Sequence, residues 1–180
     1  MGRVRMTLRR LIVLLLVTAG AAFAADTRPP APVDLDRYAG TWHEIARIPM
    51  FFQRHCARDV TATYTRRDDY VEVLNRCVTA DGETIVAEGK AFVTDPPTNR
   101  RLEVGFFSIF GWMPFKGDYW ILDVDPDYRW AIVGHPRRTY GWILSRTPEL
   151  DPATRADIDQ RLRAFGYDPA AFSAGGAPYR

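Results

Sequence analysis

The residues best suited to chemistry in this sequence are a histidine and a cysteine side by side, His55 and Cys56. A cysteine acts as a nucleophile when a base in reach removes the proton of its thiol. Adjacency in the sequence does not bring the two side chains face to face, and Cys77 offers Cys56 another partner. We therefore expect no catalytic residue and no enzyme, with catalysis by Cys56 as the alternative.

The three histidines, His43, His55 and His135, are a second source of chemistry. They are scattered, and their spacing matches none of the usual ligand patterns of zinc sites. We expect no metal and no cofactor, and a haem carrier with one axial histidine stays open as an alternative.

The first 24 residues differ in kind from the rest of the chain. Four arginines between positions 3 and 10 precede an apolar run at 11–17, and Ala22-Phe23-Ala24 places small residues two apart. This pattern predicts a secretory signal peptide at 1–24, followed by a proline-rich leader at 25–33. Thiols pair in the oxidising compartments that such peptides lead to, so Cys56 and Cys77 are predicted to form a disulfide.

The charge balance argues against one class of partner. Without residues 1–24, which hold four arginines and no acid, the 24 basic residues become 20 against 22 acidic ones, a net charge of −2. Nucleic-acid binding needs clustered Lys and Arg. We expect no nucleic-acid partner.

From Thr41 onward the chain falls into short runs of aromatic and β-branched residues between turn formers such as Asp81-Gly82 and Asp95-Pro96-Pro97. Such regular spacing is typical of hairpins in an antiparallel sheet. We read eight strands, at 41–48, 59–66, 70–78, 84–94, 100–108, 118–124, 128–134 and 139–146. A sheet of eight strands removes its edges by closing into an up-and-down barrel, whose interior holds one small ligand.

A single helix follows the strands. Asp151 is its expected N-cap, Pro152 its first residue and Gly166 its end, and Ile158 and Leu162 share the face that packs on the outside of the barrel. The predicted fold is all-β with this C-terminal helix, one domain at 34–172, and a flexible tail at 173–180.

Three motifs occur in order along the chain, at residues 38–46 (YAGTWHEIA), 122–128 (LDVDPDY) and 142–148 (WILSRTP). They resemble the opening Gly-x-Trp motif, the second motif and the third motif of the lipocalin family, and within it those of the bacterial outer-membrane lipocalins. The resemblance covers about residues 34–172 and implies the lipocalin, or calycin, barrel. It departs in two respects. The second motif has Val124 and Pro126 where many relatives have Thr and Tyr, and the bacterial relatives carry an acylated cysteine after the signal peptide, where this chain has Ala25. We therefore expect a periplasmic or secreted protein without a lipid anchor.

The resemblance implies a structural role for five residues. Trp42 plugs the base of the barrel, Gly40 lets the chain cross closely beneath it, and Arg146 lays its guanidinium on the Trp42 ring. Asp125 and Tyr128 are the residues carried over from the second motif. Glu44 is in phase with Trp42, and we expect it to be buried with a partner such as Arg146 or a backbone amide, or else to orient a ligand headgroup.

Alternation along the strands predicts the residues that face a ligand. On the last strand it is counted from an inward-pointing Arg146, and on the other strands its phase is taken from the family resemblance. The predicted lining is Leu102, Val104, Phe106, Tyr119, Ile121, Trp130, Ile132, Tyr140, Trp142 and Leu144. These side chains could equally fill the barrel as a core, and that alternative stays open.

Two loops at the open end of the predicted barrel are unusually apolar. They carry Phe51, Phe52, Phe110, Trp112 and Phe115. Exposed apolar patches mark contact surfaces. The loops either touch a membrane surface transiently or fold over the cavity as a lid.

The function expected from these observations is binding and transport or storage of a small apolar ligand, such as a fatty acid or lysophospholipid, in envelope lipid handling. The alternatives are an enzyme or haem carrier on the same fold, and an interaction scaffold that uses the mouth loops. We expect a monomer or a weak homodimer.

Overall fold

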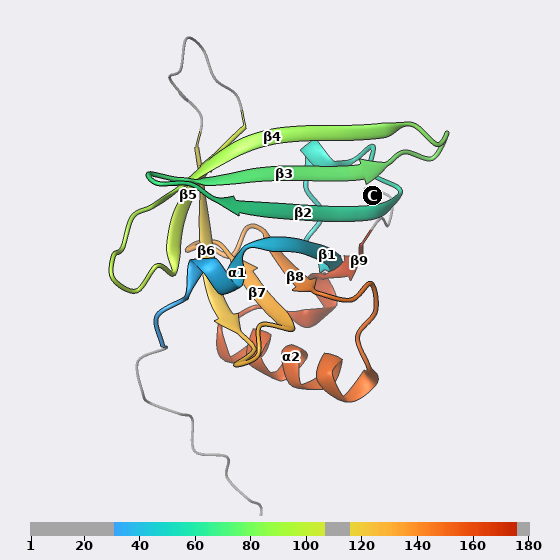
Figure 1. The fold of residues 1–180 in the computed structure, drawn as a ribbon. Coiled ribbons are helices and arrows are strands. Elements are labelled where there is room, and N and C mark those ends of the chain that lie inside the picture. The colour runs from blue at the N-terminus through green and yellow to red at the C-terminus, as the bar shows by residue number, and fades with distance from the viewer. Residues whose placement is uncertain (1–30, 107–115, 176–180) are drawn as a thin grey trace, which may run out of the picture.

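The computed structural model describes residues 31–106 and 116–175, which form an antiparallel barrel with helices at its outside (Figure 1). The strands are β1 (Gly40–Arg47), β2 (Arg58–Arg66), β3 (Val71–Val78), β4 (Thr84–Val93), β5 (Arg101–Gly105), β6 (Gly117–Val124), β7 (Trp130–Gly134), β8 (Gly141–Ser145) and β9 (Ser173–Ala174). The helices are α1 (Leu35–Tyr38), η1 (Phe51–Gln53), α2 (Pro152–Ala164) and η2 (Pro169–Ala171). No helix of these described residues is long and apolar enough to cross a membrane.

Each strand from β2 to β7 pairs with the next in the sequence, and β1 joins β2 and β8 at the two ends of this series. The first half of β1 pairs with β2, with Gly40 opposite Tyr64, and β1 also pairs with β8. This closure confirms the predicted eight-stranded up-and-down barrel.

The folded part of the chain extends slightly beyond the predicted domain, 34–172, at both ends. Val33, assigned to the leader, is 1% exposed in the core and donates its N–H to the carbonyl of Thr98. Ser173 and Ala174, assigned to the tail, form β9 and pair with the end of β1. The short helix α1 was not predicted, because four residues capped by Asp34 carry too little periodicity to be recognised.

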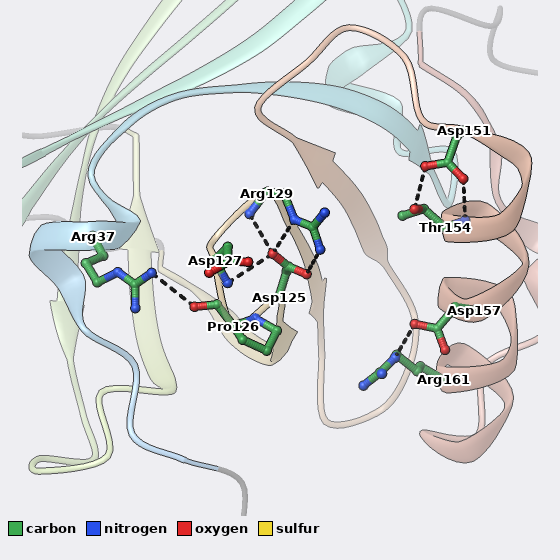
Figure 2. Close-up of polar contacts among 9 residues, drawn as sticks. All are labelled: Arg37, Asp125, Pro126, Asp127, Arg129, Asp151, Thr154, Asp157 and Arg161. Atoms are coloured by element: carbon green, nitrogen blue, oxygen red, sulfur yellow. Dashed lines mark hydrogen bonds and ion pairs between the residues drawn. The ribbon is translucent and has the colours of Figure 1, made fainter.

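The helix α2 begins and packs as the sequence indicates. The Asp151 side chain accepts from the backbone N–H of Thr154 at 2.9 Å and from its hydroxyl at 2.6 Å (Figure 2). Gly166 follows the helix at φ +80, a left-handed conformation that glycine adopts at little cost. Ile158 and Leu162 are fully buried against the outer faces of β7 and β8, along which α2 lies (Figure 1).

The base of the barrel is closed by Trp42 and Arg146. The Arg146 guanidinium lies 3.8 Å from the centre of the Trp42 ring and donates to backbone carbonyls of α1, of β1 and of the turn before β7. Gly40, at φ +95, starts β1 in a conformation that L side chains rarely adopt, and a Cβ there would meet Arg146 Nη1 at 3.3 Å. The predicted contact between Arg146 and Trp42 is confirmed.

The second motif forms the turn between β6 and β7. The Asp125 carboxylate accepts from the backbone N–H of Asp127 and from the guanidinium and backbone N–H of Arg129 (Figure 2). These bonds lower the pKa of Asp125. Tyr128, at φ +57, accepts from the backbone N–H of Asp34 at 2.8 Å. Asp125 therefore shapes the turn, and Tyr128 joins it to the start of the folded chain.

Candidate functional site

A cavity of about 690 Å³ lies in the barrel on the mouth side of Trp42. Its wall on β2, β3 and β4 consists largely of small or aliphatic side chains, among them Val60, Ala62, Val73 and Ala87. Small side chains leave the volume that larger ones fill at the base, so the barrel interior is part core and part cavity. The alternation of side chains between the two faces of a strand could also have identified these wall residues. The sequence interpretation did not find them because it did not decide which residues of β2, β3 and β4 face inward.

The structure places the predicted lining residues in three groups. Those that border the cavity are Val104, Phe106, Tyr119, Tyr140, Trp142 and Leu144. Leu102 and Ile121 point inward but belong to the packed core around Trp42.

Trp130 and Ile132 were predicted to face inward, and this is wrong. Both belong to the cluster between the barrel and α2, while Ala131 and Val133 face the interior. Every residue of β7 is buried, because one face meets the interior and the other meets α2. A strand that is apolar on both faces shows no polar alternation from which its phase could be read.

A bulge in β1 builds a polar group into the wall. The register with β8 shifts between Glu44 and Ala46, so Ala46 joins the outer cluster and Arg47 lies opposite the inward-facing Trp142. Because of this extra residue, Glu44 and Arg47 come together in an ion pair in which both side chains are nearly fully buried. Burial raises the pKa of Glu44, and Arg47 and Gln53 oppose that rise. Glu44 is therefore buried and paired, as expected, but its partners are Arg47 and Gln53, and not the Arg146 or backbone amide that were suggested.

Gln53 connects this ion pair to the mouth of the barrel. Its amide donates to Glu44 Oε2 at 2.7 Å and accepts from Trp142 Nε1 at 3.1 Å. Gln53 belongs to η1, so these bonds tie the first mouth loop to β1 and β8. The sequence interpretation did not identify Gln53, because its partners are distant in sequence and depend on the bulge.

Three tyrosine hydroxyls meet at the floor of the cavity. Tyr119 Oη lies 2.8 Å from Tyr38 Oη and 2.7 Å from Tyr64 Oη. Burial raises the pKa of all three phenols, so they are neutral. Tyr64 and Tyr119 border the cavity.

The mouth carries exposed aromatic side chains. Phe51 is 65% exposed and Phe52 55%, and both border the cavity. Phe106, at the end of β5, is 44% exposed. The other predicted mouth residues, Phe110, Trp112 and Phe115, lie outside the described residues.

The predicted disulfide between Cys56 and Cys77 is present, with the Cα atoms 5.5 Å apart. It joins the end of the first mouth loop to the end of β3, and it removes the thiol that a nucleophilic mechanism would need. The three histidines, all within the described part, do not themselves border the cavity, although His135 lies against two residues that do, with its Nε2 3.5 Å from Asp118 Oδ2 and its ring 4.3 Å from that of Tyr140. Because Cys56 is held in the disulfide, the geometry does not support a cysteine nucleophile.

Comparison with known proteins agrees with this architecture. Residues 33–175 match the family model of a lipocalin-like domain. The chain is 38% identical over 170 residues to the outer membrane lipoprotein Blc of Escherichia coli (strain K12), covering 88% of this chain and 93% of that protein. It is 32% identical over 167 residues to apolipoprotein D of Rattus norvegicus, covering 86% and 84%. The crystal structure of insecticyanin from Manduca sexta superposes with a TM-score of 0.63 at 24% identity over 85% of each chain, which supports the fold.

Proposed function

Because this chain belongs to the lipocalin family, whose members bind small hydrophobic ligands, we propose that it carries or stores a single-chain lipid in its barrel. A fatty acid or a lysophospholipid fits the proposal, since each has one flexible apolar chain and one polar end. The similarity to the lipoprotein Blc and to apolipoprotein D supports a lipid as the ligand class.

The observation that carries this proposal is the cavity itself. Its volume of about 690 Å³ falls in the range of small-molecule sites, and its walls are mostly aliphatic and aromatic. An acyl chain that enters it leaves water for an apolar surface, which stabilises the complex by about 0.8 kcal/mol for each CH₂ group buried.

Neighbouring residues on β4 provide a matched test. Ala87 borders the cavity, whereas Glu88 pairs with Leu74 and faces outward, and both are exposed. Ala87→Trp should weaken binding of hexadecanoic acid at least about tenfold, because the indole occupies the space of the chain. Glu88→Trp, which adds the same group outside, should leave the affinity within about twofold.

Isothermal titration calorimetry measures both affinities, and thermal unfolding checks that both variants are folded. Equal affinities for the two variants would place the ligand elsewhere. Native mass spectrometry of the purified protein shows whether a lipid co-purifies, and the same spectrum tests the expectation of a monomer or weak homodimer.

The aromatic rim suggests how a lipid enters. Phe51 and Phe52 lie beside the cavity yet face solvent, so a bilayer surface offers them an apolar environment. We include transient membrane contact in the proposal.

Replacing both Phe51 and Phe52 by Ser should lower co-sedimentation of the protein with vesicles of phosphatidylethanolamine and phosphatidylglycerol. Leu74→Ser, which removes an apolar side chain 37% exposed on the outer face of β3, should leave it unchanged. Unchanged co-sedimentation of the Phe51 and Phe52 double variant would reject membrane contact and favour the lid.

The site of action belongs to the proposal as well. The signal-like segment at 1–24 and the disulfide both suit the periplasm or the exterior. Cell fractionation, with mass spectrometry of the mature N-terminus, tests it: full-length protein in the cytoplasm with both thiols free would contradict this location.

A further inference from the structure

The floor of the cavity holds a polar group that the binding of a plain acyl chain leaves unused. It is the cluster of Tyr38, Tyr64 and Tyr119, which come from α1, β2 and β6 and meet only in the closed barrel. Tyr119 is the middle member, and its hydroxyl bonds to the other two. Tyr38 lies beneath, 3% exposed and outside the cavity lining.

Counting protons shows that the cluster has one donor to spare. Three neutral phenols bring three hydroxyl protons, and the two hydrogen bonds among them use two. Within the described part of the chain, these hydroxyls have no further acceptor. Whichever way the two bonds run, one O–H therefore remains without an acceptor.

The spare O–H can donate a hydrogen bond to an acceptor in the cavity. If Tyr38 donates to Tyr119, the free proton lies on Tyr64 or on Tyr119, and both of these residues line the cavity. Only the arrangement in which Tyr64 donates to Tyr119 and Tyr119 to Tyr38 places it on Tyr38. Hydroxyl rotation interconverts the arrangements, so an acceptor arriving from the cavity selects one in which Tyr64 or Tyr119 donates to it.

The electrostatic surroundings define the kind of acceptor. Glu44 is paired with the buried Arg47, and its negative charge still contributes to the rise of the Tyr64 pKa, so it also disfavours a second anion at the floor. Arg146, the cation that acts on Tyr38, is already occupied by backbone carbonyls on the far side of Trp42. A neutral oxygen, as in a hydroxyl or a ketone, fits this floor better than a carboxylate.

We propose that the tyrosine cluster makes the cavity selective for apolar ligands that carry a neutral oxygen acceptor at the end that enters first. This inference rests on the proposed ligand-binding function and names its substrate class: an acyl chain with a hydroxyl or keto group far from its headgroup. A plain chain displaces water from the floor and leaves the spare O–H unpaired, which costs affinity. A chain with a hydroxyl or keto group at this end accepts a hydrogen bond from the spare O–H and avoids that cost.

A matched pair of probes tests the proposal, namely hexadecanoic acid and 16-hydroxyhexadecanoic acid, titrated by calorimetry. The quantity of interest is the ratio of their dissociation constants, because changes common to both probes cancel. Tyr64→Phe combined with Tyr119→Phe removes both hydroxyls of the lining, and the ratio should shift about tenfold toward hexadecanoic acid.

Tyr38→Phe is the control, since it removes a hydroxyl of the same cluster but leaves a spare proton on Tyr64 or Tyr119. Its ratio should stay within about twofold of the wild-type value. An equal shift in the control and the double variant, or no shift in either, overturns the selectivity. Failure of the wild type to bind either acid would instead overturn the lipid-binding function itself.

An infrared measurement on the wild-type protein needs no variant. The carbonyl stretch of bound 15-oxohexadecanoic acid should move to lower wavenumber than in an alkane solvent, because a phenol donates to the ketone. A ketone band at its alkane position would show that no donor reaches it and would refute the proposal.

Discussion

Replacing Arg146 by Ala should destabilise the barrel more than any other single surface-charge change in the described chain. Its guanidinium donates to the carbonyls of Arg37 at 2.8 Å, Ala39 at 2.8 Å and Thr41 at 2.9 Å, with longer bonds to Tyr38 and Tyr128. It also covers the Trp42 ring. One side chain thus joins α1, β1 and the turn before β7.

The size of the effect follows from these contacts. The five hydrogen bonds are taken at about 0.5 kcal/mol each, the low end of the usual range, because some of the carbonyls face solvent. Stacking on Trp42 adds about 1 kcal/mol. The free energy of unfolding should therefore fall by about 3–4 kcal/mol, out of the roughly 5–15 kcal/mol typical of a domain.

Urea unfolding followed by far-ultraviolet circular dichroism measures this loss. Arg146→Lys should lose less, since an ammonium retains the charge and some donors but not the planar fork. The control is Arg161→Ala, which removes an arginine of α2 that stacks on Trp130. Its guanidinium also pairs at the surface with Asp157 (Figure 2) and with Asp123 of β6. That change should cost about 1 kcal/mol or less. If Arg146→Ala costs no more than Arg161→Ala, the assignment of Arg146 as the clamp of the base is refuted.

Three further changes test other parts of the fold. The ionised Asp125 carboxylate stabilises the folded state at a pH above its ordinary pKa, and this contribution is lost as the pH falls through the lowered pKa. Asp125→Asn should cost about 1–2 kcal/mol in urea unfolding at pH 7, and this difference should shrink as the medium is made acidic enough to protonate the carboxylate of the folded protein. A pH-independent difference would contradict this origin. Replacing Cys56 and Cys77 by Ser frees a loop with a sequence separation of 21 and should cost about 3 kcal/mol; an unchanged urea midpoint would show that the disulfide adds nothing to stability. Asp151→Ala removes the cap of α2 and should lower the free energy of unfolding by about 1 kcal/mol, and no loss would mean that other contacts hold the start of the helix.

The barrel could be predicted from the sequence because the signals that define its strands and turns lie within a few neighbouring residues. Turn formers separate the strands, and the observed strands lie within about two residues of most predicted ends, the usual scatter of such boundaries. The cap at Asp151 and the apolar face of α2 follow from helical spacing in the same way. The disulfide followed from the expected oxidising compartment and from the presence of only two cysteines.

The candidate site was predicted only in part, because its polar groups depend on distant pairings. Tyr140, Trp142 and Leu144 border the cavity as their alternation indicated, since β8 was counted from the fixed point of Arg146. The hydroxyls of Tyr38 and Tyr119 are 81 residues apart in sequence, and no spacing rule connects them.

The amino-acid sequence by itself determined which segments become strands and where the barrel is closed, because side-chain alternation and turn chemistry act over a few residues. The tertiary structure alone decided which face of β7 turns inward, since both faces are apolar and only the position of α2 distinguishes them. It also decided that Glu44 meets Arg47, because a single extra residue in β1 reverses the phase of the side chains that follow.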